Sequence, residues 1–182
     1  MEQELKDQRI NNLISLFTKG LIEECLREAH KVKKIYPDEP FIFNIIGITN
    51  ASLGKFSESI KNYQKAISLN PSYIEVYNNI GVAYNGWKKY EKAIKYLDKA
   101  INLNPTYADA FNNRGNVYKE LGKNEDAIQD YEKALEYYDK AIELSPEMAI
   151  SYENKAKLFY YKLNDLNNYL IFQDIATEKN QK

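Results

Sequence analysis

The sequence predicts an all-α protein, an α-solenoid built from about five helix–turn–helix repeats. Similar stretches return at a constant step: "IFNIIGITNASLG", "VYNNIGVAYNGWK" and "AFNNRGNVYKELG" begin at positions 42, 76 and 110. Pro37, Pro71 and Pro105 follow the same step, and Pro146 comes after a longer one. A period of about 34 residues is typical of repeat architectures, in which each repeat buries its apolar face against its neighbours.

Each repeat is predicted to contain two helices joined by a tight turn. Proline disfavours helix in the residue before it and suits the first turn of the next helix, so the prolines mark junctions between repeats. Glycine just past a helical run is a C-terminal cap signal. Such second breaks fall at Gly20, Gly54, Trp87-Lys88, Gly122 and Asn164. The predicted repeats are residues 4–37, 38–71, 72–105, 106–146 and 147–180, within one solenoid domain over residues 1–182.

Small residues recur where the two helices of a repeat must touch. Gly47, Gly81 and Gly115 share one position in the first helices, with Leu13 and Ala156 there in the first and fifth repeats. Glycine inside a helix costs about 1 kcal/mol relative to alanine, so its return indicates a close helix crossing. In the second helices the small residues are alanines. Cys25 takes the place of one in the first repeat, which favours a buried thiol over a reactive one.

The fourth repeat contains seven extra residues. "YEKALEYYDKAIEL" is one heptad written twice, Tyr131–Tyr137 and Tyr138–Leu144. Seven residues make almost two helical turns, so a single longer helix over Asn124–Leu144 is expected. It displaces the fifth repeat from the line of the others and adds apolar surface at Tyr138, Ala141 and Ile142. That surface is covered by the fifth repeat itself, by a partner or by a second copy of the chain.

The stretch "YNNIGVAYNGWKKYEKAIKYLDKAINLNP" and its two neighbours resemble the tetratricopeptide repeat family. Length, aromatic–small–aromatic order and terminal proline all agree. The resemblance implies a right-handed superhelix, with first helices along a concave inner wall and second helices outside. The fifth repeat then reads as a degenerate repeat that closes the array. The implied function is a non-catalytic scaffold or adaptor that binds a peptide or helix of a partner protein in the concave groove.

Asparagines recur at positions that the resemblance places in or near this groove. An amide offers an acceptor and two donors, so it can pair with any peptide backbone. With helices about 10 Å apart and an extended chain rising about 3.3 Å per residue, such amides could hold one peptide bond about every three residues. The predicted groove residues are Asn11, Asn44, Asn78, Asn79, Asn112, Asn113, Asn116 and Asn154, with Tyr160 as a stacking or apolar contact.

Two known grooves of the family bear on these asparagines. The positions of Asn79 and Asn113, with Asn11 and Asn154, are similar to the asparagine ladder in the repeat domain of O-linked N-acetylglucosamine transferase. The alternative is that they are exposed helix residues supplied by AT-rich codons. A carboxylate clamp, which holds acidic chaperone tails, is disfavoured because the groove positions lack the cations that it needs.

Composition argues against several other functions. Lys and Arg number 25 and Asp and Glu 26, so the basic excess of a nucleic-acid or membrane-surface binder is missing. The charged N-terminus and short apolar runs favour a cytoplasmic protein. With His30 as the only histidine and no phosphate-binding loop, we expect no enzyme activity, cofactor or metal. Two alternatives stay open: a homodimer formed through helix 124–144 and the fifth repeat, or a docking module of a larger enzyme or chaperone complex.

Overall fold

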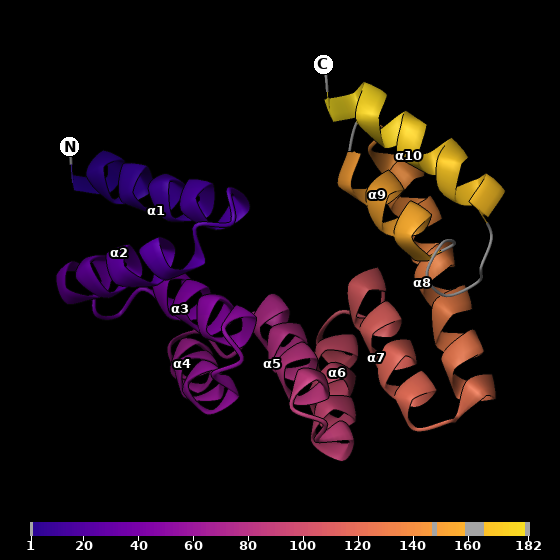
Figure 1. The fold of residues 1–182 in the computed structure, drawn as a ribbon, viewed down its shortest axis with the longest axis horizontal. Coiled ribbons are helices and arrows are strands. Elements are labelled where there is room, and N and C mark those ends of the chain that lie inside the picture. The colour runs from indigo at the N-terminus through magenta and orange to yellow at the C-terminus, as the bar shows by residue number, and fades with distance from the viewer. Residues whose placement is uncertain (1, 147–148, 159–165, 181–182) are drawn as a thin grey trace. The chain divides into compact units, whose positions relative to one another are not determined.

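The computed structural model describes residues 2–146, 149–158 and 166–180, which form ten α-helices and no strands (Figure 1). The helices are α1 (Glu2–Thr18), α2 (Ile22–Ile35), α3 (Pro40–Ser52), α4 (Phe56–Leu69), α5 (Ile74–Gly86), α6 (Tyr90–Leu103), α7 (Ala108–Glu120), α8 (Asn124–Leu144), α9 (Ala149–Leu158) and α10 (Leu166–Asn180). The prediction of an all-α helical-repeat fold is confirmed.

The chain divides into two compact units. The N-terminal unit, Met1–Leu103, holds α1 to α6, and the C-terminal unit, Asn104–Lys182, holds α7 to α10. Within each unit, consecutive helices pack against each other. The number of repeats, and a single solenoid domain over residues 1–182, stay predictions.

The repeated glycines lie where the two helices of a pair cross. They face Tyr63, Leu97 and Tyr131 of α4, α6 and α8. A Cβ added to Gly81 would lie 2.5 Å from Cγ of Leu97, and one added to Gly115 would lie 2.6 Å from the Tyr131 ring. Gly47 is closer still to its partner. No side chain fits at these distances, so the close crossing predicted from the sequence is confirmed.

The tight turn inside each of the first four helix pairs closes with the same hydrogen bonds. After α3, Gly54 has φ 72°, its N–H donates to the Ala51 carbonyl (2.9 Å), and the Lys55 N–H donates to the Asn50 carbonyl (2.8 Å). This is the Schellman motif, which needs a left-handed residue that is usually glycine. The third turn departs from the rule: Lys88, with φ 58°, occupies the left-handed position.

Replacing Lys88 with glycine is expected to stabilise the chain. A left-handed conformation costs a non-glycine residue about 1–2 kcal/mol, whereas the extra backbone entropy of glycine costs at most about 1 kcal/mol. We therefore expect Lys88→Gly to raise the free energy of unfolding by about 0.5–1 kcal/mol, measured by urea denaturation. The reciprocal control is Gly122→Lys in the C-terminal unit, which should lose a similar amount. A lower unfolding free energy for Lys88→Gly would contradict the expectation.

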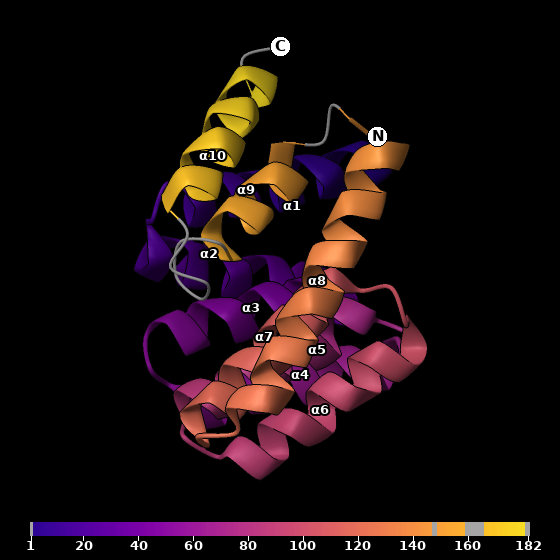
Figure 2. The ribbon, with the colours of Figure 1, turned by 90° about the vertical axis from the view of Figure 1, so that its right-hand side faces the viewer.

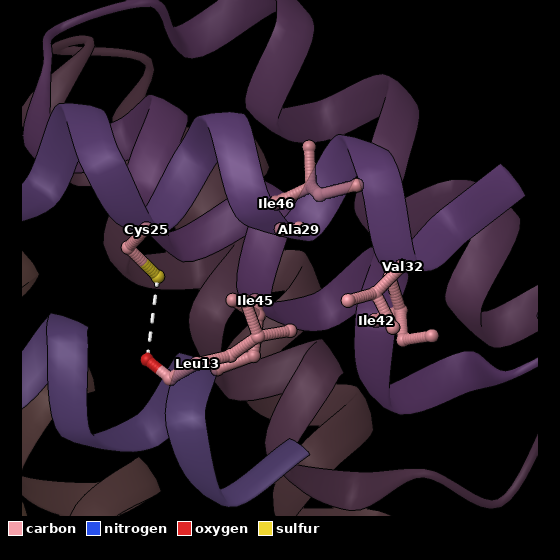
Figure 3. Close-up of a cluster of buried hydrophobic side chains, with 7 residues drawn as sticks. All are labelled: Leu13, Cys25, Ala29, Val32, Ile42, Ile45 and Ile46. Atoms are coloured by element: carbon pink, nitrogen blue, oxygen red, sulfur yellow. Dashed lines mark hydrogen bonds between the residues drawn. The ribbon is translucent and has the colours of Figure 1, made fainter. Parts of the chain in front are cut away.

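The core around the first helix pair is shown in Figure 3. It consists of Leu13, Cys25, Ala29, Val32, Ile42, Ile45 and Ile46, all buried. The Cys25 thiol donates to the Leu13 carbonyl at 3.4 Å, and burial raises the pKa of this thiol (Figure 3). The prediction that Cys25 is a small buried residue is confirmed. Ile45 shares the repeat position of Asn79, yet here that position belongs to the core.

The junctions around the prolines use asparagine as a turn residue. Asn70 lies between α4 and Pro71, and its side-chain Oδ1 accepts from the Ser72 N–H at 3.1 Å. Asn104, before Pro105, accepts from the Thr106 N–H at 3.0 Å in the same way. These two asparagines therefore serve the backbone, because a short amide side chain can satisfy a turn N–H.

The seven-residue duplication lengthens one helix. α8 runs from Asn124 to Leu144 without a break, as predicted. In Figure 2 its C-terminal turns extend beyond α7 and approach α9. Tyr138, from the second heptad, is buried, and an ion pair joins Asp139 to Lys155 of α9. The fifth repeat thus covers part of the added surface, while Leu144 stays 85% exposed. Displacement of the fifth repeat stays a prediction.

Candidate functional site

Asparagine side chains connect two first helices in the N-terminal unit. Nδ2 of Asn79 on α5 donates to Oδ1 of Asn44 on α3 at 3.0 Å. Nδ2 of Asn44 donates in turn to the Tyr73 hydroxyl at 3.4 Å, and burial raises the pKa of that hydroxyl. Asn44 is only 5% exposed, whereas Asn79 is half-buried. Asn44 therefore positions the amide of Asn79 and is not itself presented to a ligand.

A pocket of about 420 Å³ opens next to this amide pair. Its walls come from α3, α4 and α5 and include Ile48, Ala51, Phe56, Asn79, Val82 and Ala83. Val82 is 44% exposed although its side chain is wholly apolar. A benzene molecule fits an engineered cavity of about 150 Å³, so this pocket has room for a large apolar side chain. The Asn79 amide at its wall can bond the backbone of the same ligand.

Aromatic rings continue from one wall of the pocket. Phe56 stacks on Trp87 with ring centroids 6.2 Å apart, and Trp87 lies nearly parallel to Tyr84 at the same centroid distance. Nζ of Lys89 sits 3.5 Å from the centre of the Trp87 ring. Trp87 is 37% exposed. The sequence pattern predicted Trp87 only as part of a helix break. A signal that could have marked it is that it is the single tryptophan and lies at a turn where Lys88 replaces the usual glycine.

The predicted groove residues of the C-terminal unit lie on α7 and α9. Nδ2 of Asn154 donates to Oδ1 of Asp109 at 3.1 Å, and the Tyr138 hydroxyl donates to the same oxygen at 2.5 Å. Burial, together with Asp109, raises the pKa of Tyr138. Asn116 accepts a hydrogen bond from the Tyr131 hydroxyl at 3.1 Å. These amides are thus already engaged in holding helices together.

The remaining predicted residues have varied surroundings. Oδ1 of Asn112 is buried and has no hydrogen-bond partner, so it is not presented to a ligand. Asn113 is half-buried and Asn78 is 6% exposed, and each has an interaction within the chain. Asn11 is exposed on α1. Tyr160 lies outside the described residues. The structure therefore joins Asn44 with Asn79 and leaves the others in different settings.

In the C-terminal unit a buried ion pair joins α7 to α8. Nε and Nη2 of Arg114 on α7 both donate to the Asp130 carboxylate on α8, each at 2.8 Å. Asp130 is 5% exposed, and the guanidinium lies 5.5 Å from the centre of the Phe111 ring. We did not predict this pair, because charged residues on helices are usually solvated. Its role is to join the two helices, since both partners are already satisfied.

A second pocket, of about 640 Å³, lies along α6. Ile67, Tyr77 and Ile94 form its apolar part, and lysines of α6 alternate with acidic residues around it. The Tyr77 hydroxyl is engaged with the Pro71 carbonyl at 3.1 Å. The pocket is larger, but no predicted groove residue reaches it, and we take the smaller pocket beside Asn79 as the candidate site.

Two further features are absent from the described residues. No group of three His, Cys, Asp or Glu side chains among them could hold a metal ion. In the same part of the chain, no helix has both the length and the apolarity needed to cross a membrane.

Helix pairs that cross at a repeated glycine, turn through a left-handed residue and end at a proline define a tetratricopeptide repeat fold. Family models agree with this fold. A model described as TPR repeat matches residues 50–85. One model described as Tetratricopeptide repeat matches residues 74–107 and 108–137, and a second with the same description matches residues 129–148. The chain belongs to the tetratricopeptide repeat family. Proteins of this family are in general non-catalytic scaffolds for protein–protein interaction.

Solved structures show the same fold. A crystal structure of MamA is 27% identical, covers 92% of this chain and 93% of its own, and has a TM-score of 0.58. TTC0263, a thermophilic TPR protein in Thermus thermophilus, is 22% identical over 97% of this chain and 92% of its own, with a TM-score of 0.70. YrrB, described as a TPR protein with an unusual peptide-binding site, is 18% identical over 96% of this chain and 86% of its own, with a TM-score of 0.53. No curated protein matches the sequence.

Proposed function

We propose that this protein is a non-catalytic adaptor that binds a peptide segment of a partner protein in the groove between α3 and α5. The observation that carries the proposal is the pocket beside Asn79, in which an exposed apolar side chain, Val82, lies next to an amide that is held in place by Asn44. Such sites combine apolar walls with a few oriented polar groups, which is the usual composition of a ligand pocket.

The amide of Asn79 and the apolar side chains of the pocket have different roles in binding. Asn79 donates to Asn44 through Nδ2, which leaves its Oδ1 to accept from a peptide N–H. This contact does not depend on the side chains of the peptide. Val82 and Ile48 bury apolar side chains of the peptide, and most of the affinity is expected from that burial.

The proposal is tested by selecting ligands and then removing the pocket. A phage-displayed library of random twelve-residue peptides is selected on the immobilised full chain, and the affinity of each selected peptide is measured by fluorescence anisotropy. Val82→Glu places a charge where an apolar side chain must be buried, and we expect it to weaken binding by about tenfold or more.

The matched control is Ile128→Glu on α8. Ile128 is 50% exposed and lines no pocket described above, so this variant adds the same charge at a similar exposure and should bind as the unaltered chain does. Selected peptides that bind Val82→Glu with unchanged affinity would place the ligand elsewhere. A library that yields no peptide above background would remove the proposed function.

Self-association is the second candidate, and specific residues favour it. In the C-terminal unit Leu144 is 85% exposed, and Leu170 and Ile171 on α10 are 49% and 53% exposed. Exposed large apolar side chains favour association when they form a contiguous patch. Light scattering separates the candidates: a dimer that Leu170→Glu dissociates supports a homodimer through α8 and α10, and a monomer that binds selected peptides supports the adaptor.

A further inference from the structure

The N-terminal unit carries a row of apolar residues at one repeat position. Ile14, Ile48 and Val82 occupy the same place in three successive repeats, on α1, α3 and α5. Ile14 and Val82 are 41% and 44% exposed, and Ile48 is half-buried. α1 contacts α3, and α3 contacts α5, so the three helices follow one another in space (Figure 1). In the C-terminal unit the same position holds Asn116, so the apolar row is a feature of the N-terminal unit.

The spacing of this row selects a peptide conformation. Packed helices lie about 8–10 Å apart, which sets the distance between neighbouring members of the row. A polyproline II helix has three residues per turn and rises about 3.1 Å per residue, so every third side chain points the same way at steps of about 9 Å. An extended strand turns every third side chain to the opposite face. An α-helix rises only about 5.4 Å per turn.

The walls around the row favour the same conformation and an uncharged ligand. α3 contains no charged residue, α5 contains only Glu75, and the five charged residues of α1 all precede Ile10, in a protein of which 28% of residues are charged. Phe56 lines the pocket and stacks on the partly exposed Trp87. Polyproline II segments dock in grooves lined with aromatic rings. Their backbone makes no internal hydrogen bonds, so it is free to bond Asn79.

We infer that the N-terminal unit binds an uncharged polyproline II segment of a partner protein, with an apolar side chain at every third position seated on Ile14, Ile48 and Val82. The inference rests on the proposed function and specifies the ligand of the same groove. Each turn of the segment spans one first helix, and the aromatic rings from Phe56 to Trp87 contact the proline rings at one end.

The probe is a fluorescein-labelled peptide of four Leu-Pro-Pro repeats. Its control has the same composition, with the leucines clustered at one end. Binding to the full chain is measured by anisotropy and, with unlabelled peptide, by the emission of Trp87, the only tryptophan. We expect the regular peptide to bind about tenfold or more tightly than the clustered one and to shift the Trp87 emission, because only the regular peptide seats all its leucines. Val82→Glu should abolish that preference and Ile128→Glu should keep it.

The outcomes separate this inference from the function on which it rests. Equal affinity of the regular and clustered peptides overturns the inference, and so does a preference that survives in Val82→Glu. If the random library yields ligands that depend on Val82 but lack the three-residue spacing, the inference fails and the adaptor function stands. If neither the library nor the designed peptide yields a ligand, both fail.

Discussion

Replacing Gly81 with leucine should prevent the N-terminal unit from folding. Even a single Cβ at this position would lie 2.5 Å from Cγ of Leu97, and three further carbons would have to occupy space filled by α6. Overpacking a core typically costs about 1–3 kcal/mol, and this case exceeds that range because α5 and α6 cannot stay at their present distance. We expect reduced helix content by far-UV circular dichroism and an emission of Trp87 shifted to the red.

The adjacent residue supplies the control. Val82→Leu enlarges an apolar side chain by one carbon at a site that is 44% exposed, and its effect should stay within about 0.5 kcal/mol. Gly81→Ala combined with Leu97→Ala should destabilise the chain less than the sum of the single changes, because the second substitution makes room for the first. If Gly81→Leu has the same melting temperature as the unaltered protein, the packing of α5 on α6 does not depend on this close crossing.

Replacing Arg114 with isoleucine should cost the C-terminal unit about 3 kcal/mol, because removing one partner of a buried ion pair costs about 3–5 kcal/mol. The change leaves the Asp130 carboxylate, 5% exposed, without the two hydrogen bonds that it now accepts. The lower value applies because the Arg114 side chain is still 20% exposed. Urea denaturation followed by circular dichroism measures the loss.

The preceding repeat provides the matching double variant. Ile80 and Tyr96 occupy the positions of Arg114 and Asp130 one repeat earlier in the chain. Arg114→Ile with Asp130→Tyr therefore places at these two positions the residues that the fold accepts one repeat earlier. Replacing a buried ion pair by packed apolar residues is often neutral or stabilising, so the double variant should recover most of the loss. If Arg114→Ile alone is neutral, water or another group must already satisfy Asp130.

The pattern along the chain was sufficient to predict the described helices and the first four turns inside the pairs. The fifth predicted break, at Asn164, lies outside the described residues. The breaks at Gly20, Gly54 and Gly122 and the limits of α8 follow from rules that act within one helix or between a helix and the next. The crossing at Gly81 was also predictable, because only close contact explains a glycine that returns in the middle of a helix.

The candidate site could be predicted only in part. Asn44 and Asn79 were both expected in the groove, but one is buried and orients the other. Neighbouring residues in a helix are about 100° apart, so one step along the sequence decides between core and groove. The exposure of Ile14 and Val82 was not predicted, because apolar residues that recur in a repeat are expected to lie in the core.

By itself, the sequence determined the class of fold, the close crossings and the length of α8, because a regular repeat imposes the same local rules several times. Only the tertiary structure decided which amide bonds which, that Arg114 reaches Asp130 inside the C-terminal unit, and that Phe56 brings Trp87 to the edge of the pocket. Those contacts depend on the rotation of each helix against its neighbour, and that rotation is set by the packing of whole side chains rather than by the repeat period.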